Sequence, residues 1–556
     1  MRYAIGLDFG TESGRAVLVD VSTGTEVATA IHAYANGVID RHLPVPDEDL
    51  RLEPDWALQD PDDYLATLRS TVPQLLRETG IDAGEVIGVG IDFTSCTMLP
   101  TTADGTPLCR LAALRREPHA WVKLWKHHAA QPEADRLNAV AAARGEPWLP
   151  RYGGRISSEW FFSKALQILD EAPAVYRAAD RLIEAGDWLV WQLTGVETRN
   201  SCAAGYKALW SKADGFPDPG YFADLDPAFA SVVADKMSGT IRSIGERAGE
   251  LSSEAAAWTG LRPGTPVAIG NVDAHVSVPA TGVTEPGTMV AVMGTSTCHM
   301  VLGSRLAPAE GIAGVVEDGI IPGFFGYEAG QAAVGDMFAW FTRQAVPPEI
   351  HDEARRTGSS VHAVLEAEAA RFRPGETGLL ALDWWNGNRS ILVDAELSGL
   401  LVGATLATRP ADIYRALLES TAFGTRTIIE SLEAAGVGVE RVVACGGLAE
   451  RNALLMQLSA DITGRELAVA ASNQVAALGS AMYGAVAAGA AAGGYDSIAD
   501  AARRMVRPPV RTYRPGPSTR AVYDALHREY MGLHDHFGRH GTDVMRRLRA
   551  LRTGAA

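Results

Sequence analysis

The stretch PVAIGNVDAHVSVPATGVTEPGTMVAVMGTST, residues 266–297, decides how the rest of this chain is interpreted. It predicts an apolar strand over 267–269, a loop that carries the acid Asp273, and a second apolar strand over 289–293 that runs into the small-residue loop Gly294-Thr295-Ser296. A carboxylate at the end of a buried strand stands where open α/β sheets carry their chemistry. A Gly-Thr-Ser turn offers backbone N–H groups and hydroxyls to an anion, most often a phosphate.

The alternative interpretation is that Asp273 caps a turn and that Gly294 only permits a tight one. The N-terminus favours the functional interpretation because it repeats the arrangement: an apolar strand over 3–9 ends in DFGTESG (8–14), and a second strand follows. This hairpin is predicted to wrap a phosphate with Gly10, Thr11 and Ser13, while Asp8 is directed at the metal of that phosphate. The repeat predicts two related halves that face one another.

Composition excludes several classes of function. The chain has 556 residues and a net charge of −17, which argues against nucleic acid or an anionic membrane as a partner. A phosphate ligand must then be held locally, by backbone amides and a metal. The five cysteines are scattered without a CxxC pair, which predicts a reduced, cytoplasmic protein, and no signal peptide is visible. The uncharged run 475–494 is mostly Ala and Gly, so it is predicted to form a tightly packed buried helix and not a membrane span.

Three further positions are candidates for ligand binding. Asp92 follows a buried strand, where it either hydrogen-bonds a polyol or closes the strand. Lys207 lies among aromatic and small residues in GYKALW, where it either binds a ligand or extends its ammonium to the surface. The strand RVVACGG ends in Gly446 and Gly447, which would let an adenine approach the backbone without a side-chain clash.

On these motifs the chain resembles the FGGY carbohydrate kinases of the actin-like ATPase superfamily, over nearly its whole length. Within that family it is most similar to the ribulokinases, through DFTSCT (92–97), LWKHHAA (124–130) and DWWNGNRS (383–390). The resemblance implies an α/β fold of two actin-like (ribonuclease H-like) domains with a catalytic cleft between them. Residues 1–282 would bind the sugar and residues 283–556 the nucleotide, with a helical C-terminal tail from about residue 503.

The resemblance also implies the activity, which is ATP-dependent phosphorylation of L-ribulose at O5 to L-ribulose 5-phosphate, a step of L-arabinose catabolism. Mg²⁺ would lie near Asp8, and Asp273 would accept the O5 proton. The implied sugar-binding residues are Asp92, Cys96, Lys207, Asp273 and Glu328. The implied nucleotide-binding residues are Gly10, Thr11, Ser13, Gly294, Thr295, Ser296, Gln331, Asp336, Gly446, Gly447 and Asn452.

Two alternatives to this activity stay open at the level of sequence. One is another FGGY ketopentose kinase, a D-ribulokinase or a xylulokinase. The other is a non-catalytic actin-like ATP-binding module, which would lack a sugar pocket. The sequence leaves open whether the chain forms a homodimer, and it assigns no role to DWWNGNRS or to the C-terminal tail.

Overall fold

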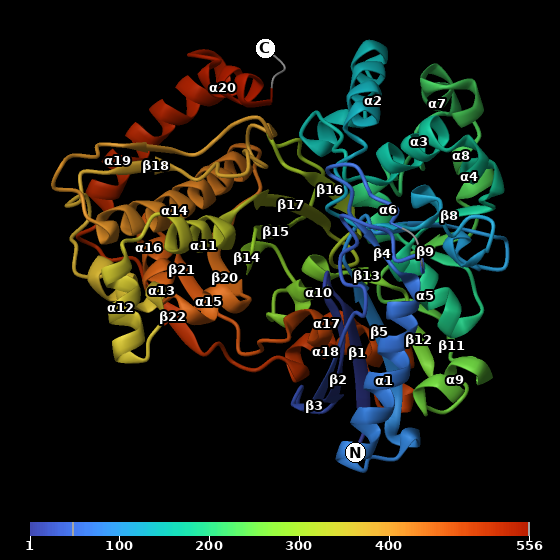
Figure 1. Ribbon diagram of the computed structural model, residues 1–556. Helices are drawn as coiled ribbons and strands as arrows, with labels where there is room; N and C mark the ends of the chain where they lie inside the picture. Colours follow the sequence, from blue (N-terminus) through green and yellow to red (C-terminus); the bar gives the residue numbers. More distant parts are fainter. Residues whose placement is uncertain (47–48, 554–556) are drawn as a thin grey trace.

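The computed structural model describes residues 1–46 and 49–553, and it is built around two seven-stranded sheets (Figure 1). The first sheet has the order β11-β12-β5-β1-β2-β3, with β13 also paired to β5. Strands β1, β2 and β3 are antiparallel neighbours, whereas β5 runs parallel to β1. Its strands are β1 (Tyr3–Phe9), β2 (Ser13–Asp20), β3 (Glu26–Ala33), β5 (Val86–Phe93), β11 (Arg247–Glu250), β12 (Pro266–Ala268) and β13 (Asn271–Val272).

The second sheet has the order β16-β17-β15-β14-β20-β21-β22. Strands β14, β15 and β17 are antiparallel neighbours, and β20 runs parallel to β14, so the pattern of the first sheet recurs. The repeat predicted from the two hairpins is confirmed. The strands are β14 (Gly287–Met293), β15 (Thr297–Gly303), β16 (Gly314–Glu317), β17 (Phe325–Gln331), β20 (Val439–Cys445), β21 (Glu466–Val469) and β22 (Arg511–Tyr513).

Helices pack on both faces of the sheets, and one group of them lies between the two halves (Figure 1). The first sheet is covered on its outer face by α1 (Pro61–Thr79), α5 (Ala185–Thr194) and α9 (Ser253–Thr259). The second is covered by α11 (Val334–Gln344), α12 (Pro348–Thr357), α13 (Val361–Ala369), α14 (Pro410–Ala434), α15 (Gly447–Arg451) and α16 (Ala453–Thr463). Between the sheets lie α10 (Asp273–Ala280), α17 (Val475–Ala488) and α18 (Ile498–Met505), in one apolar core.

Helix α17 is pressed unusually close to the first sheet, although it follows β21 in the chain. A Cβ on Gly6 of β1 would lie 1.7 Å from the Ala477 carbonyl oxygen, and one on Gly90 of β5 would lie 1.8 Å from that of Ser480. Only glycine permits this approach of helix backbone to strand backbone. The Ala- and Gly-rich run therefore forms a buried helix, as predicted, and within the described residues no helix is long and apolar enough to cross a bilayer.

A smaller unit is inserted between the strands of the first half, with a core of its own that includes Trp121, Phe162 and Tyr221. Its four-stranded sheet is formed by β4 (Leu58–Gln59), β6 (Met98–Thr101), β7 (Val122–Lys123) and β8 (Arg181–Glu184). Around it lie the short strands β9 (Thr198–Asn200) and β10 (Thr240–Arg242) and the helices α2 (Gln131–Arg144), α3 (Phe161–Glu171), α4 (Pro173–Ala178), α6 (Ser201–Lys207), α7 (Pro219–Leu225) and α8 (Val232–Lys236).

The C-terminal region is more than the predicted helical tail. Residue 503 lies inside α18, and β22 then pairs with β21 as a strand of the second sheet. Helix α19 (Arg520–Asp535) buries Tyr523 and Tyr530 in the core of the second half, and α20 (Val544–Thr553) follows it. A two-stranded hairpin of β18 (Leu380–Leu382) and β19 (Leu400–Val402) completes this half.

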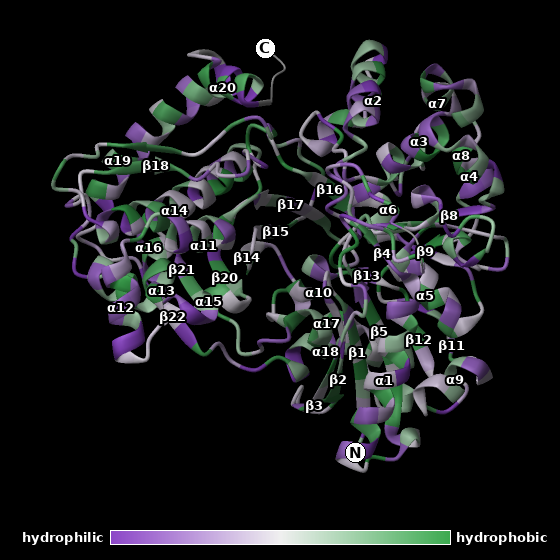
Figure 2. Cartoon of the chain, viewed as in Figure 1, coloured by the Kyte–Doolittle hydropathy of each residue, from purple (hydrophilic) through white to green (hydrophobic). Residues whose placement is uncertain are grey.

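Hydropathy explains why the strands were predicted well and α10 was not. The central strands of the first sheet are strongly apolar in Figure 2 and stand out from the polar segments around them. Asp273 was expected in a loop, but it is the first residue of α10. Residues 275–280 of this helix are all buried, so it has no polar face and shows no helical alternation in its sequence.

Candidate active site

Three acids of the first half meet where its strands end. Asp8 on β1 and Asp92 on β5 are register partners, and Asp273 follows at the start of α10. Burial and the proximity of Asp8 raise the pKa of Asp273 to about 7, and burial also raises the pKa of Asp8 and, further, that of Asp92. Because carboxylates close together cannot all stay ionised, this cluster favours a bound cation.

Asp92 lies beneath the other two acids. Its side chain is fully buried, and its Oδ2 accepts a hydrogen bond of 2.6 Å from Ser480 Oγ of α17. Its burial and its bond to Ser480 fit the alternative in which Asp92 closes the strand, and its contact with a sugar stays a prediction.

Asp8 is the acid that fits a magnesium ion. Its carboxylate is 13% exposed, and its Oδ2 lies 3.3 Å from Arg15 Nε. In residues 1–46 and 49–553, no cluster of three or more His, Cys, Asp or Glu side chains is arranged to hold a metal. Mg²⁺ commonly takes only one or two carboxylates and completes its shell with water and substrate phosphates. The single accessible carboxylate of Asp8, backed by Asp92, matches that mode of binding.

The two residues expected on either side of the sugar bind each other. Lys207, the last residue of α6, donates from Nζ to both carboxylate oxygens of Glu328 on β17, at 2.9 and 3.0 Å. Both side chains are buried. His275 Nε2 lies 3.4 Å from Glu328 Oε2, and Arg389 donates to Oε1 at 2.5 Å. Burial alone would raise the pKa of Glu328, but Lys207, His275 and Arg389 hold it well below its ordinary value.

Cys96 lies in the loop that follows β5, with a left-handed backbone conformation (φ 60°) and a buried thiol. Its carbonyl oxygen accepts a hydrogen bond of 2.8 Å from Lys164 Nζ, which also donates to the carbonyl of Leu124 at 2.7 Å. The buried ammonium thereby fixes the loop that carries Cys96 to the segment before Trp125. The implied contact of Cys96 with a sugar stays a prediction, and in the structure its carbonyl is bonded inside the protein.

The two predicted phosphate loops are each closed by a backbone hydrogen bond, but residues 10–13 form the first and the shorter stretch 294–296 forms the second. Gly10 N donates to Ser13 O at 3.0 Å, and Gly294 N donates to Ser296 O at 2.9 Å. The second loop is the more open one, because Gly294 and Thr295 are exposed. A Cβ on Gly294 would have only Ser296 O within 4 Å, at 3.9 Å. The backbone there is thus accessible to a ligand.

Two residues expected to contact the nucleotide are occupied within the protein. Gln331 is buried: its Nε2 donates to Asp383 Oδ2 and to the Thr421 carbonyl, while its Oε1 accepts from Thr425 Oγ1. Asn452 is also buried and caps α16, with Oδ1 accepting from Leu455 N at 2.8 Å. In the structure both side chains are bonded inside the protein, and their contact with the nucleotide stays a prediction. Both stabilise the second half.

The remaining nucleotide candidates differ in how open they are. Asp336 is exposed in the first turn of α11, beside the second phosphate loop. Gly446 has a φ of 91°, and a Cβ there would lie 2.5 Å from the Met293 carbonyl, so the protein's own packing requires glycine. At Gly447 a Cβ would approach only the end of the Arg451 side chain, at 2.6 Å. Gly447 is therefore the better candidate for a close approach by a base.

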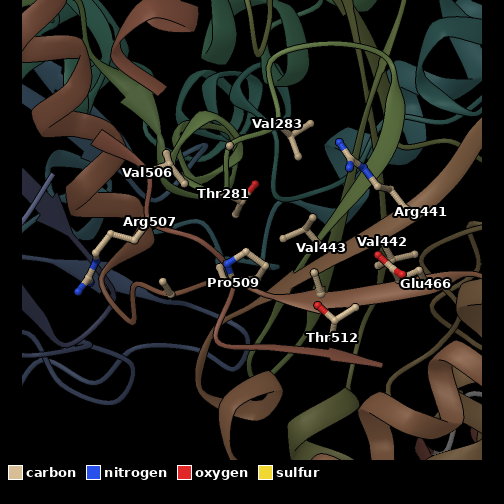
Figure 3. Close-up of a pocket in the computed structure, with 14 residues that line it drawn as sticks. Thr281, Val283, Arg441, Val442, Val443, Glu466, Val506, Arg507, Pro509 and Thr512 are labelled. Atoms are coloured by element: carbon tan, nitrogen blue, oxygen red, sulfur yellow. The ribbon is translucent and has the colours of Figure 1, made fainter. Parts of the chain in front are cut away.

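Sequence reasoning missed Arg389 and His275, the other two partners of Glu328; burial lowers the pKa of His275, so its imidazole is a polar partner and not a second cation like Arg389. Arg389 belongs to DWWNGNRS, which was noted without a role, whereas nothing in the sequence singled out His275. A separate groove of about 180 Å³ lies where the chain passes between the halves, lined by segments around Val283, Val443 and Val506 (Figure 3). None of the predicted site residues lines it.

Comparison with known proteins defines the class. The N-terminal domain of the FGGY family of carbohydrate kinases matches residues 3–278, and the C-terminal domain of that family matches residues 289–488. The chain belongs to this family and is a carbohydrate kinase.

Individual relatives narrow the class further. The chain is 56% identical over 552 residues to a ribulokinase of Halalkalibacterium halodurans, covering 99% of this chain and 98% of the relative. It is 52% identical over 555 residues to a ribulokinase of Mycolicibacterium smegmatis, covering 100% and 97%. A xylulose kinase from Rhodospirillum rubrum shares the fold with a TM-score of 0.76 at 24% identity, covering 96% of this chain and 98% of that one. Plasmodium falciparum glycerol kinase with ADP does so with a TM-score of 0.73 at 15% identity, covering 96% and 98%.

Proposed function

We propose that this carbohydrate kinase transfers the γ-phosphoryl group of ATP to O5 of L-ribulose, giving L-ribulose 5-phosphate for L-arabinose catabolism. The observation that carries the transfer chemistry is Asp273, an acid with a pKa raised to about 7, in the half that carries Asp8 and the first phosphate loop. The choice of sugar is supported by the full-length similarity to ribulokinases from several bacteria.

Asp273 is the proposed general base. A base works best when its pKa lies near the operating pH, because it is then both ionised and able to hold the transferred proton. The turns at Gly10–Ser13 and Gly294–Ser296 are proposed to hold the β- and γ-phosphates with their N–H groups. Mg²⁺ at Asp8 would supply the positive charge that neutralises those phosphates. Positioning and neutralisation are the main demands of phosphoryl transfer.

The sugar is proposed to bind between Lys207 and Glu328. In the structure the two side chains hold one another across the halves, with Lys207 in the first and Glu328 in the second. A sugar hydroxyl is both donor and acceptor, so it can take one of these direct bonds, donating to Glu328 and accepting from Lys207. The first half is proposed to hold most of the sugar and the second half the nucleotide, with Glu328 as the second half's contribution to the sugar.

A substrate panel tests this function. ADP release is measured in a coupled assay with L-ribulose, D-ribulose, D-xylulose and glycerol, each with ATP and Mg²⁺. We expect L-ribulose to be phosphorylated efficiently. The enzyme should discriminate less strongly against the other ketopentoses than against glycerol, which should be rejected because it leaves buried polar groups of the site unpaired. Efficient turnover of xylulose or glycerol with poor turnover of both ribuloses would contradict the proposal. If none of the sugars increases ADP release, the proposal is wrong and ATP binding without sugar phosphorylation is favoured.

The same proposal includes a cytoplasmic location and leaves a homodimer open. Light scattering on the purified protein would show whether two copies associate. Cell fractionation would show where the protein resides.

A further inference from the structure

Arg389 lies beside the proposed sugar-binding pair of Lys207 and Glu328. A Cβ on Gly330 of β17 would lie 3.1 Å from Arg389 Cδ, so the arginine stem runs close over this strand. Its Nη2 donates to Glu328 Oε1, and its Nη1 lies 3.7 Å from Cys298 Sγ on β15. The Arg389 side chain is 31% exposed, in contrast to 2% for Glu328. Arg389 is therefore a partner of the buried Glu328 carboxylate that also reaches solvent.

The three partners of Glu328 come from different halves. Lys207 is on α6 and His275 is on α10, both before residue 283, whereas Arg389 follows β18 in the same half as Glu328. A sugar that inserts between Lys207 and Glu328 removes a buried ion pair from direct contact. A buried carboxylate without its cation is strongly destabilised. Arg389 needs no movement between the halves to stay bound to Glu328.

We propose that Arg389 is a positioning residue for the sugar: it keeps Glu328 ionised and oriented while a ketopentose hydroxyl takes the place of the Lys207 contact. The inference rests on the proposed function, since it requires that Lys207 and Glu328 bind the sugar. It also gives DWWNGNRS, the segment without a role in the sequence, a function in sugar affinity.

The planar guanidinium suits this task better than an ammonium. Two of its nitrogens face two different partners in one plane, Glu328 Oε1 and Cys298 Sγ. A lysine would supply the charge without this second contact or the fixed geometry. Arg389→Lys should therefore restore part of what Arg389→Met loses.

The test is a comparison of Michaelis constants in three variants. Arg389→Met is expected to raise KM for L-ribulose about 10- to 100-fold, the range for losing a charged hydrogen bond, while KM for ATP changes less than about 3-fold. Arg389→Lys should lie between Arg389→Met and the unchanged protein. Arg546→Met is the matched control, because Arg546 is also 31% exposed and pairs with an acid, Asp394, in the second half. It should leave both KM values unchanged.

The pH profile separates positioning from simple packing. The groups that face Glu328 are Lys207 on α6, His275 on α10 and Arg389, with Cys298 and Asp273 nearby. Without Arg389 the Glu328 carboxylate becomes protonated at a higher pH, so the affinity for L-ribulose, measured by calorimetry, should begin to fall at a higher pH in Arg389→Met than in the unchanged protein. Binding is measured because the acid limb of kcat/KM is set by Asp273. A packing defect would lower the affinity equally at every pH.

The outcomes distinguish this inference from the proposed function. If Lys207→Met raises the sugar KM and Arg389→Met does not, the role of Arg389 is wrong and the sugar site stands. If neither variant changes the sugar KM, the site itself is wrong. Should Arg389→Met not fold, Arg389→Gln decides by the same split between the sugar and ATP constants, and equal KM values in Arg389→Gln and the unchanged protein would overturn the proposal.

Discussion

The two sheets share one strand order, but the ends of their strands carry different chemistry. In the first half Asp8 on β1 is the register partner of Asp92 on β5. In the second half the corresponding partners, on β14 and β20, are Val292 and Cys445. The chain after β13 continues with Asp273, whereas the chain after β21 continues with Ala470 and Ala471.

The two phosphate loops also differ in how they are held in place. Side chains from other segments hold the first loop: Trp125 Nε1 donates to Thr11 Oγ1 at 3.0 Å, and Gln59 Nε2 donates to the Thr11 carbonyl at 2.7 Å. The second is exposed and is supported by the backbone of Gly335, whose N–H donates to the Thr295 carbonyl at 2.9 Å. The two halves thus share a fold but differ in their polar groups. The first half brings acids together at its strand ends, and the second half has a loop with exposed backbone.

The largest effect is expected when Asp273, the proposed base in the first half, is replaced by a neutral residue. Asp273→Asn should lower kcat by about 10²- to 10⁴-fold, because the amide cannot accept a proton, while ATP affinity changes little. The control is Asp500→Asn, an acid in the first turn of α18 that belongs to the same layer of helices. Near-normal turnover of Asp273→Asn in the coupled assay would contradict the assignment.

The next effect concerns the open loop of the second half. Gly294→Val should weaken ATP binding by about 10- to 100-fold, because its side chain fills the space in front of the loop N–H groups. The protein itself should stay folded, since the new Cβ meets only Ser296 O, at 3.9 Å. Calorimetry with ATP measures the loss, and sugar binding serves as the control. Unchanged ATP affinity would mean that the exposed backbone at Gly294 does not bind the nucleotide.

The pH dependence of activity sharpens the comparison further. Because the pKa of Asp273 is raised to about 7, kcat/KM should fall about tenfold per pH unit below that value, as the base becomes protonated. The largest causes are burial and the nearby Asp8, both within the first half, and Glu328 of the second half raises the pKa further. The residual activity of Asp273→Asn should lack this acid limb, and a limb at the same pH in that variant would assign it to another group.

Stability should respond to the same acid with a defined sign. The folded-state pKa lies above the unfolded value of about 3.9, so the stability that neutral Asp273 contributes is present below pH 4 and is lost as pH rises through 7. The melting temperature of Asp273→Asn should therefore exceed that of the unchanged protein at pH 8 and approach it at pH 5. Thermal scans without metal or nucleotide measure this. A constant difference across pH would contradict the linkage.

The smallest effect is expected from removing the hydrogen bond between Trp125 and the first phosphate loop. Trp125→Phe removes the bond to Thr11 Oγ1 but keeps an aromatic ring, so the loss is about 1 kcal/mol, or roughly 5-fold in KM for ATP. The second loop has no tryptophan counterpart among the hydrogen bonds of the described residues. A change as large as that of Gly294→Val would show that the first loop, too, depends on open backbone.

The sequence alone determined the features that depend on residues close together in the chain, such as strands and turns. Apolar strands that end in Gly-Thr loops predicted both hairpins and their repeat, because strand periodicity and turn chemistry are local properties. The same local pattern placed Asp8 and Asp273 at strand ends. These residues alone predicted a phosphate site with a metal near Asp8, and the resemblance to the FGGY family added the kinase activity and the role of Asp273.

Only the tertiary structure decided which polar groups find each other. Gln331 is occupied by Asp383 and Thr421, which lie 52 and 90 positions away, and Lys207 meets Glu328 across 121 positions. Helix α17 packs on strands that precede it by hundreds of residues, where Ser480 holds Asp92. A buried polar group must be paired, but the sequence offers many residues that could be its partner. Packing of the two halves determines which of them is bonded, and no local sequence pattern predicts that partner.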